Sequence, residues 1–156
     1  MLKKPHHSNP VAELIGEVLR VGGRLTSVFA SVNAIAGLLP METTVLAVVV
    51  ESPVAPTVPQ IGRSLGHSRQ MIQRTVNTLM AAGLIEKAPN PHHKLAPLLL
   101  PTPEGRKVKQ RVDARASEIM AALLRRTSAG KCRRLSGEMR ELRHEIEAHL
   151  RQAGAS

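Results

Sequence analysis

Residues 57–83 read TVPQIGRSLGHSRQMIQRTVNTLMAAG, and this stretch decides the fold. Thr57 and Gln60 have the spacing of a capping box, which predicts that a helix begins directly after Thr57. Gly66 can adopt the positive φ that ends a helix, and Ser68 can cap a second helix only two residues later. The stretch therefore predicts two short helices joined by a tight glycine turn.

The second helix has one apolar face and one polar face. It is predicted to run to Ala82 and to end at Gly83. At about 100° per residue, the inward stripe comprises Ile72, Val76 and Leu79. The outer face and its flank carry Arg69, Gln70, Gln73, Arg74 and Asn77. A helix, a glycine turn and a second helix with a polar outer face are typical of a helix-turn-helix unit.

A β-hairpin pattern follows the two helices. Residues 84–88 and 96–100 are predicted to form strands, with a proline-rich loop over 89–95. The prolines fit strand edges and ends, where no ladder hydrogen bond is lost. Thr102-Pro103 then predicts the start of the next helix. The hairpin would form a wing beside the second helix, so the predicted fold class is mainly α with a small β-wing (α+β), a winged helix-turn-helix.

Long amphipathic helices are predicted on both sides of this region. Apolar residues recur at steps of three and four over 11–39, and Gly22-Gly23 in the middle favours a bend or a close helix contact. A short helix over 41–50 is expected to be buried, and two further amphipathic helices follow. The long stripes exceed what a winged helix of about 60 residues can cover, so a partner's helices are needed to bury them. The predicted organisation is a tail (1–10), an N-terminal dimerisation helix (11–39), a winged helix-turn-helix region (40–102), C-terminal dimerisation helices (103–151) and a second tail (152–156).

The charge of the chain indicates a polyanionic partner. The chain has 156 residues with 22 Lys plus Arg against 12 Asp plus Glu, a net charge of +10. Residues 60–115 hold ten basic and three acidic residues, and no acidic residue occurs between Glu51 and Glu86. A carboxylate on a helix that enters a DNA groove would be repelled by phosphate. Because Phe29 is the single aromatic residue, modules that stack bases on aromatic platforms are excluded, and double-stranded DNA is the predicted partner.

Other classes of protein are disfavoured by the sequence. The seven His and the single Cys show no metal-ligand spacing, and no catalytic arrangement stands out, so we expect no metal, no cofactor and no enzyme activity. The longest aliphatic run, 45–50, is far shorter than the ~20 residues of a membrane span, and the cytoplasm is the expected location. Cys132 aligns with Leu135 and Met139 on one helical stripe, which favours a small buried core residue over a redox switch.

These patterns resemble the MarR family of bacterial winged-helix transcriptional regulators. The matching segments are Leu38 through Leu46, Thr57 to Leu65, Ser68-Arg69-Gln70, Leu79-x-x-x-Gly83-Leu84-Ile85 and Thr102-Pro103-Glu104-Gly105-Arg106. Gly83 and Gly105 keep the spacing that the family has across the wing. The resemblance implies an obligate homodimer whose two winged helices are spaced for a palindromic operator. It also implies that a small-molecule effector releases the DNA in many relatives, although the sequence identifies no ligand pocket.

The chain departs from the family pattern in its wing. The family usually carries an Asp and an Arg near the wing tip, and the corresponding stretch here is His93-Lys94-Leu95. Only Lys94 supplies a fixed charge, so we expect wing binding to be weaker or more dependent on pH. Pro101 stands where the pattern has an aliphatic residue, which leaves the path of the return strand open.

The polar face of the second helix supplies the candidate DNA contacts. Base-edge contacts are predicted for Arg69, Gln70, Gln73 and Arg74, because Arg suits guanine and Gln suits adenine. Phosphate contacts are predicted for Thr57, Ser68, Asn77 and Lys94. The predicted function is a dimeric, sequence-specific transcriptional regulator, most often a repressor in this family. The alternatives are a winged-helix protein-interaction module that lost operator reading and a nonspecific architectural DNA-binding protein.

Overall fold

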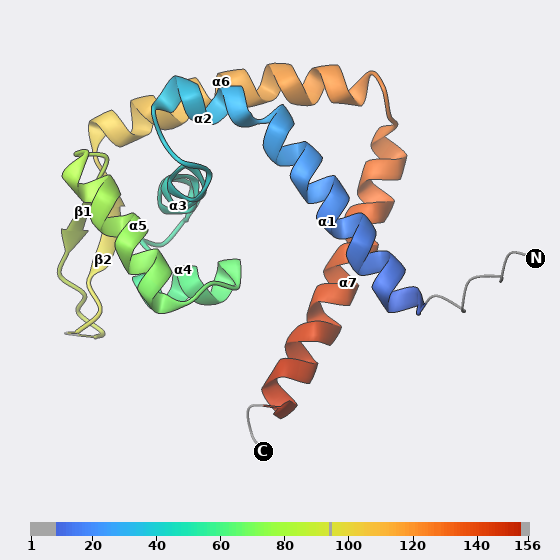
Figure 1. Cartoon of the computed structure of the whole chain (residues 1–156). Helices are drawn as coiled ribbons and strands as arrows, with labels where there is room; N and C mark the ends of the chain where they lie inside the picture. The colour runs from blue at the N-terminus through green and yellow to red at the C-terminus, as the bar shows by residue number, and fades with distance from the viewer. Residues whose placement is uncertain (1–8, 94, 154–156) are drawn as a thin grey trace, which may run out of the picture. The chain divides into compact units, whose positions relative to one another are not determined.

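The computed structural model describes residues 9–93 and 95–153 (Figure 1). Its elements are α1 (Pro10–Val28), α2 (Ala30–Ala36), α3 (Pro40–Glu51), α4 (Val58–Leu65), α5 (Arg69–Ala81), β1 (Ile85–Ala88), β2 (Leu98–Pro101), α6 (Pro103–Leu124) and α7 (Ala129–Ala153). The chain divides into two compact units, Met1–Ala116 and Ser117–Ser156. The first unit holds α1 to β2 and the beginning of α6, and the second holds the rest of α6 and α7. The fold is mainly α with one small sheet, as the sequence predicts.

α3, α4, α5 and the two strands share one hydrophobic core in the first unit. α3 packs against α5 and β2, and α4 packs against α5 (Figure 1). The largest fully buried side chains are Leu46, Ile61, Ile72, Leu79, Leu99, Val45 and Val76. Because Ile72, Val76 and Leu79 are all completely buried, the predicted inward stripe of α5 is confirmed.

The local signals in residues 57–83 produce the predicted helix boundaries. The Thr57 N–H donates to Gln60 Oε1 over 2.8 Å, and the Thr57 hydroxyl donates to the same oxygen over 2.9 Å, which closes the capping box of α4. Gly66 ends α4 with a φ of 69°. The Ser68 hydroxyl then accepts from the Met71 N–H over 3.2 Å at the start of α5. The glycine turn therefore has a positive-φ glycine at the end of α4 and a side-chain cap at the start of α5.

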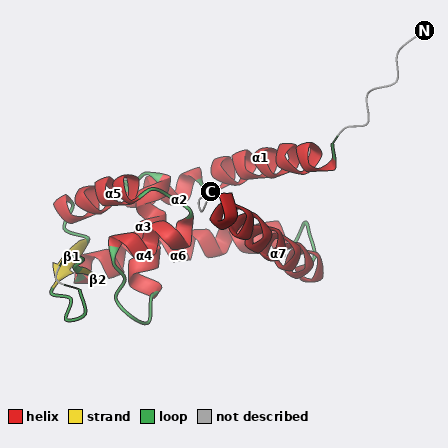
Figure 2. Cartoon of the chain, turned by 90° about the horizontal axis from the view of Figure 1, so that it is seen from below, coloured by secondary structure: helices red, strands yellow, loops and turns green. Residues whose placement is uncertain are grey.

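The wing is a two-stranded antiparallel hairpin next to α5 (Figure 2). Its register runs from Ile85 opposite Pro101 to Ala88 opposite Leu98. The return strand begins two residues later than predicted and includes Pro101, which lies at the strand's end, where its missing N–H interrupts no inner ladder bond. Within the loop, the Asn90 side-chain amide donates to the Ala96 carbonyl oxygen over 2.7 Å. This hydrogen bond closes the loop across its base.

Thr102 joins the base of the wing to α5 and α6. Its hydroxyl donates to the Gly83 carbonyl oxygen over 2.7 Å and accepts from the Gly105 N–H over 3.0 Å. The Thr102 N–H donates to the Leu84 carbonyl oxygen over 3.1 Å. A Cβ atom at Gly105 would overlap that same carbonyl oxygen. This close approach explains why the Thr-Pro-x-Gly turn contains a glycine.

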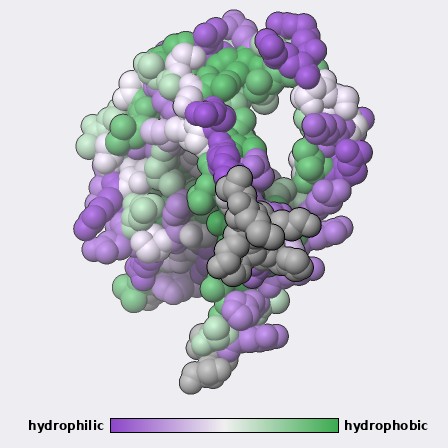
Figure 3. Space-filling view, turned by 45° about the vertical axis from the view of Figure 1, so that its right-hand side comes forward, coloured by the Kyte–Doolittle hydropathy of each residue, from purple (hydrophilic) through white to green (hydrophobic). Residues whose placement is uncertain are grey.

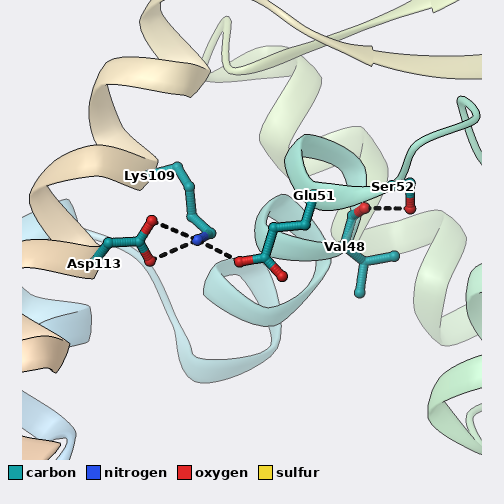
Figure 4. Close-up of polar contacts among 5 residues, drawn as sticks. All are labelled: Val48, Glu51, Ser52, Lys109 and Asp113. Atoms are coloured by element: carbon teal, nitrogen blue, oxygen red, sulfur yellow. Dashed lines mark hydrogen bonds and ion pairs between the residues drawn. The ribbon is translucent and has the colours of Figure 1, made fainter.

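Among the described residues of the first unit, one charged side chain is buried. Lys109 of α6 is 5% exposed, and its Nζ lies 2.6 Å from Glu51 Oε1 of α3 and 2.7 Å from Asp113 Oδ2 (Figure 4). Burial lowers the pKa of Lys109, but the hydrogen bonds and charges of the two carboxylates outweigh this effect and raise the pKa above its ordinary value. The lysine is therefore charged at neutral pH, and its ion pairs tie α6 to the end of α3.

The N-terminal helical region differs from the single helix predicted over 11–39. α1 passes through Gly22-Gly23 without interruption, and the break lies at Phe29, where φ is −90° and ψ is 5°. The Thr26 and Ser27 hydroxyls donate to the Gly22 and Gly23 carbonyl oxygens over 3.0 and 3.1 Å. Such back-bonding satisfies the carbonyls beside the glycines and favours distortion in the following turn. α1 therefore does not break at the glycine pair, and a Cβ atom at either glycine would meet nothing within 4 Å, so the pair makes no close helix contact in the single chain.

α6 begins at Pro103, as Thr102-Pro103 predicts, and α7 begins at Ala129. The Ser128 hydroxyl accepts from the Lys131 N–H over 3.1 Å at the start of α7. None of the described residues of α7 is buried, and Cys132 is exposed. The expectation of a buried Cys132 is therefore wrong for the single chain, because helical periodicity identifies an apolar stripe without showing what covers it. α7 reaches Ala153, two residues into the segment expected to be a tail.

We predict that Gly105→Ala lowers the free energy of unfolding by about 1 to 3 kcal/mol, because the new methyl group must push back the Leu84 carbonyl. Gly137→Ala in α7 is the control, since a Cβ atom there meets nothing within 4 Å. It should add up to about 1 kcal/mol through helix propensity. Urea unfolding of both variants measures the difference, and equal midpoints would contradict the steric argument.

Candidate nucleic-acid interface

The solvent face of α5 is polar and free of negative charge. Arg69, Gln70, Arg74 and Asn77 are exposed, opposite or beside the buried stripe of the same helix. No acidic residue occurs in the chain between Glu51 and Glu86, so no carboxylate lies on α4, on α5 or in the turn between them. The face therefore presents hydrogen-bonding groups and positive charge, together with the exposed side chain of Met71.

Gln73 and Asn77 form a pair on this face. The Gln73 side-chain amide donates to Asn77 Oδ1 over 2.9 Å, one turn further along α5. Gln73 is half-buried, whereas Asn77 is exposed. The hydrogen bond holds the two side chains in one orientation, and each amide keeps further donor or acceptor capacity for another partner.

The two caps predicted to contact phosphate are in different environments. Ser68 is exposed at the start of α5, with its hydroxyl already accepting from the Met71 N–H. Thr57 is only 7% exposed, and its hydroxyl donates to Gln60. Thr57 thus serves the capping of α4, and the geometry gives no support to a phosphate contact by its side chain.

The wing presents histidine and leucine to solvent. His92 and His93 are exposed, and Leu95 is 83% exposed. The His92 N–H donates to Asn90 Oδ1 over 3.0 Å, so the same asparagine that closes the loop also orders this turn. Lys94, the predicted phosphate contact of the wing, lies outside the described residues.

A hollow next to the turn between α4 and α5 was not predicted. It has a volume of about 350 Å³ and is lined by Pro59, Gly62, Arg63, Gly66, His67 and Arg69. Of these residues, only Arg69 was a predicted DNA contact. In the sequence, the other lining residues could have been found from Gly62 and Gly66. Two glycines leave room beside the basic residues Arg63 and His67, which are four positions apart on α4 and the turn.

The described residues hold no cluster of metal-ligating side chains and no single helix that could span a membrane. Among them, no group of three or more His, Cys, Asp or Glu side chains lies close enough to hold a metal ion. No single described helix is long and apolar enough to cross a membrane, while α2 and α3 meet the criteria of length and composition only as a pair bent by 72°.

Comparison with known proteins agrees with this geometry. Residues 36–94 match the model of the MarR family. An uncharacterised protein of Mycobacterium tuberculosis strain H37Rv, Rv2011c, is 39% identical over 109 residues, which cover 70% of this chain and 75% of the relative. The uncharacterised protein Mb2034c of Mycobacterium bovis matches to the same extent.

Solved structures share the fold. A MarR-family transcriptional regulator from Rhodococcus sp. RHA1 superimposes with a TM-score of 0.74 at 20% identity, covering 86% of this chain and 96% of the other. CouR from Rhodococcus jostii RHA1, solved with p-coumaroyl-CoA bound, has a TM-score of 0.74 at 18% identity, covering 89% and 95%. The winged helix, the polar face of α5 and the relatives lead to one conclusion: this chain belongs to the MarR family of transcriptional regulators.

Proposed function

We propose that this chain is a homodimeric regulator that binds a palindromic operator in double-stranded DNA and acts as a repressor in the cytoplasm. The observation that carries the proposal is the exposed face of α5, where Gln70, Arg74 and Asn77 stand without any carboxylate nearby. A helix of this kind fits the major groove, where side-chain amides and guanidinium groups recognise base edges. Membership of the MarR family supports the same assignment.

The side chains of α5 divide into two roles in this proposal. Gln70, Gln73 and Arg74 contact base edges, with the Gln73 to Asn77 hydrogen bond holding Gln73 in position. Asn77 and Ser68 lie at the sides of the contact and bind phosphate, as does Lys94 of the wing. Arg69 lies at the edge of this face and is not among these base contacts.

The apolar surface of α1 and α7 supports a homodimer. None of the described residues of either helix is buried within the chain. The exposed apolar side chains are Val11, Leu14, Ile15, Val18, Leu19, Val21, Leu25 and Val28 of α1 and Leu135, Met139, Ile146 and Leu150 of α7. Hydrophobic residues form green patches among purple hydrophilic ones on the face of the molecule that Figure 3 shows. Contiguous apolar stripes of this length need cover, and a second copy of the chain provides matching ones.

Release from DNA by a small molecule is a further part of the proposal. CouR was solved with p-coumaroyl-CoA, and a Staphylococcus aureus MarR with the same fold was solved with salicylate and kanamycin. Phe29 is the single aromatic residue of this chain, so its own effector would be held mainly by aliphatic and polar side chains.

Selection of bound sequences from a random duplex pool at two salt concentrations tests the proposed function. We expect a palindromic motif to be enriched at both concentrations, because base-edge contacts persist when counterion release weakens the electrostatic share. Binding without enrichment and with a steep loss at high salt would instead indicate a nonspecific architectural protein. Absence of binding would indicate a protein-interaction module.

We predict that Arg74→Ala weakens binding to the selected duplex by about 1 to 3 kcal/mol, because a bidentate base contact is lost. Binding to a random duplex should change far less. Arg133→Ala is the matched control, since it removes the same charge from the exposed surface of α7. A gel-shift titration measures the affinities, and an unchanged affinity for the selected duplex would remove Arg74 from the base-contacting set.

We predict that Ile146→Asp converts the protein from a dimer to a monomer of 16.9 kDa, because a carboxylate would be placed in the apolar stripe of α7. Arg133→Asp introduces the same group about 140° around the helix and should leave the dimer intact. Light scattering gives the masses. A monomeric wild-type protein would contradict the proposed dimer at once.

A further inference from the structure

Two glycines line the hollow beside the helix-turn-helix. Gly62 lies where α4 meets the start of α5, and a Cβ atom there would stand 3.0 Å from the His67 carbonyl oxygen. Gly66 has a φ of 69°, and a Cβ atom there would meet nothing within 4 Å. The helices therefore approach closely at one glycine, while the other leaves open space. The hollow beside the turn has a volume of about 350 Å³.

The lining of this hollow is basic. Arg63 comes from the last turn of α4, His67 from the turn and Arg69 from the first residue of α5. None of the six lining residues is acidic. The first N–H groups of α5 have no partners within the helix, and the helix dipole adds partial positive charge at this end. The charged side chains of the lining therefore favour an anion, against the partial negative charge at the C-terminus of α4.

Arg69 does not belong to the centre of the base-reading face. At about 100° per residue, its side chain leaves α5 about 140° away from that of Arg74. It lines the hollow together with Arg63. Arg69 therefore lines the hollow from a side of α5 that lies away from the middle of the polar face.

We propose that this hollow holds one phosphate of the DNA backbone, gripped by the guanidinium groups of Arg63 and Arg69 with His67 at its side. The planar fork of Arg forms paired hydrogen bonds with phosphate oxygens. The inference rests on the proposed DNA-binding function and refines it, since Arg69 becomes a positioning contact instead of a base reader. The phosphate contact sets how deeply and at what angle α5 enters the groove.

The test uses Arg63→Ala, Arg69→Ala and the control Arg133→Ala in the full-length chain. The probes are the duplex recovered by selection and a random duplex of equal length. Each hollow variant should lose about tenfold in affinity for both duplexes, because a charge-assisted contact with the backbone carries no sequence information. The slope of log affinity against log salt should fall by about one in each variant. The control should retain both the affinities and the slope.

Methylphosphonate substitution identifies the anion. Replacing each phosphate of the selected duplex in turn should reveal one position per half-site whose neutralisation weakens wild-type binding but no longer affects Arg63→Ala. Arg63→Lys should recover part of the sensitivity, because it restores the charge without the fork. If no position shows this coupling, the proposed phosphate contact is wrong.

The other outcomes distinguish a failure of the proposed phosphate site from a failure of the proposed DNA-binding function. If the wild type binds the selected duplex, and Arg63→Ala binds the selected and the random duplex with the same affinities as the wild type, the hollow is not a phosphate site. The regulator would then still bind DNA. If inorganic phosphate raises the melting temperature of the wild type but not of Arg63→Ala, without methylphosphonate coupling, the hollow takes a free anion and the proposal fails. If the wild type binds no duplex, both the proposed function and this inference are overturned.

Discussion

The close contact between Gly105 and the Leu84 carbonyl oxygen is the constraint on which the winged helix depends. The end of α5, the base of both strands and the start of α6 all meet at this point. The Thr102 hydroxyl bridges Gly83 and Gly105, because it donates to the Gly83 carbonyl oxygen and accepts from the Gly105 N–H. A side chain at Gly105 would separate α6 from the turn that precedes β1. This backbone contact and the Thr102 hydrogen bonds therefore join the end of α5, the wing and the start of α6.

α5 has one face that is buried in the core and an opposite face that is exposed and polar. Ile72, Val76 and Leu79 are completely buried, so the helix cannot rotate without exposing three large side chains. The polar face on the other side is held in place by the same burial. Lys109 has a related part in α6, because its ion pairs with Glu51 and Asp113 hold α6 against the end of α3 while the hydrogen-bonded carboxylates compensate for its burial.

Sequence predictions were accurate where one residue type has one strong local effect. The Thr57 to Gln60 box, the Gly66 turn and the Ser68 cap all appear as predicted, because capping and positive φ depend on a few neighbouring residues. They were inaccurate where two local signals competed, or where an apolar stripe has no covering surface within its own unit. The helix broke at Phe29 instead of at its glycine pair, and Cys132 lay exposed on a stripe that its own unit does not cover.

The sequence by itself determined the two helices and the turn, the approximate strands of the wing, the polar face of α5 and the concentration of positive charge around it. These features follow from periodicity, caps and composition, which act over a few residues or over the whole chain. Only the tertiary structure decided that Thr57 is buried, that Lys109 bridges two helices, and that Arg63, His67 and Arg69 line one hollow. The physical reason is that burial and close approach depend on how separate elements pack, and no local pattern records which side chains that packing brings together.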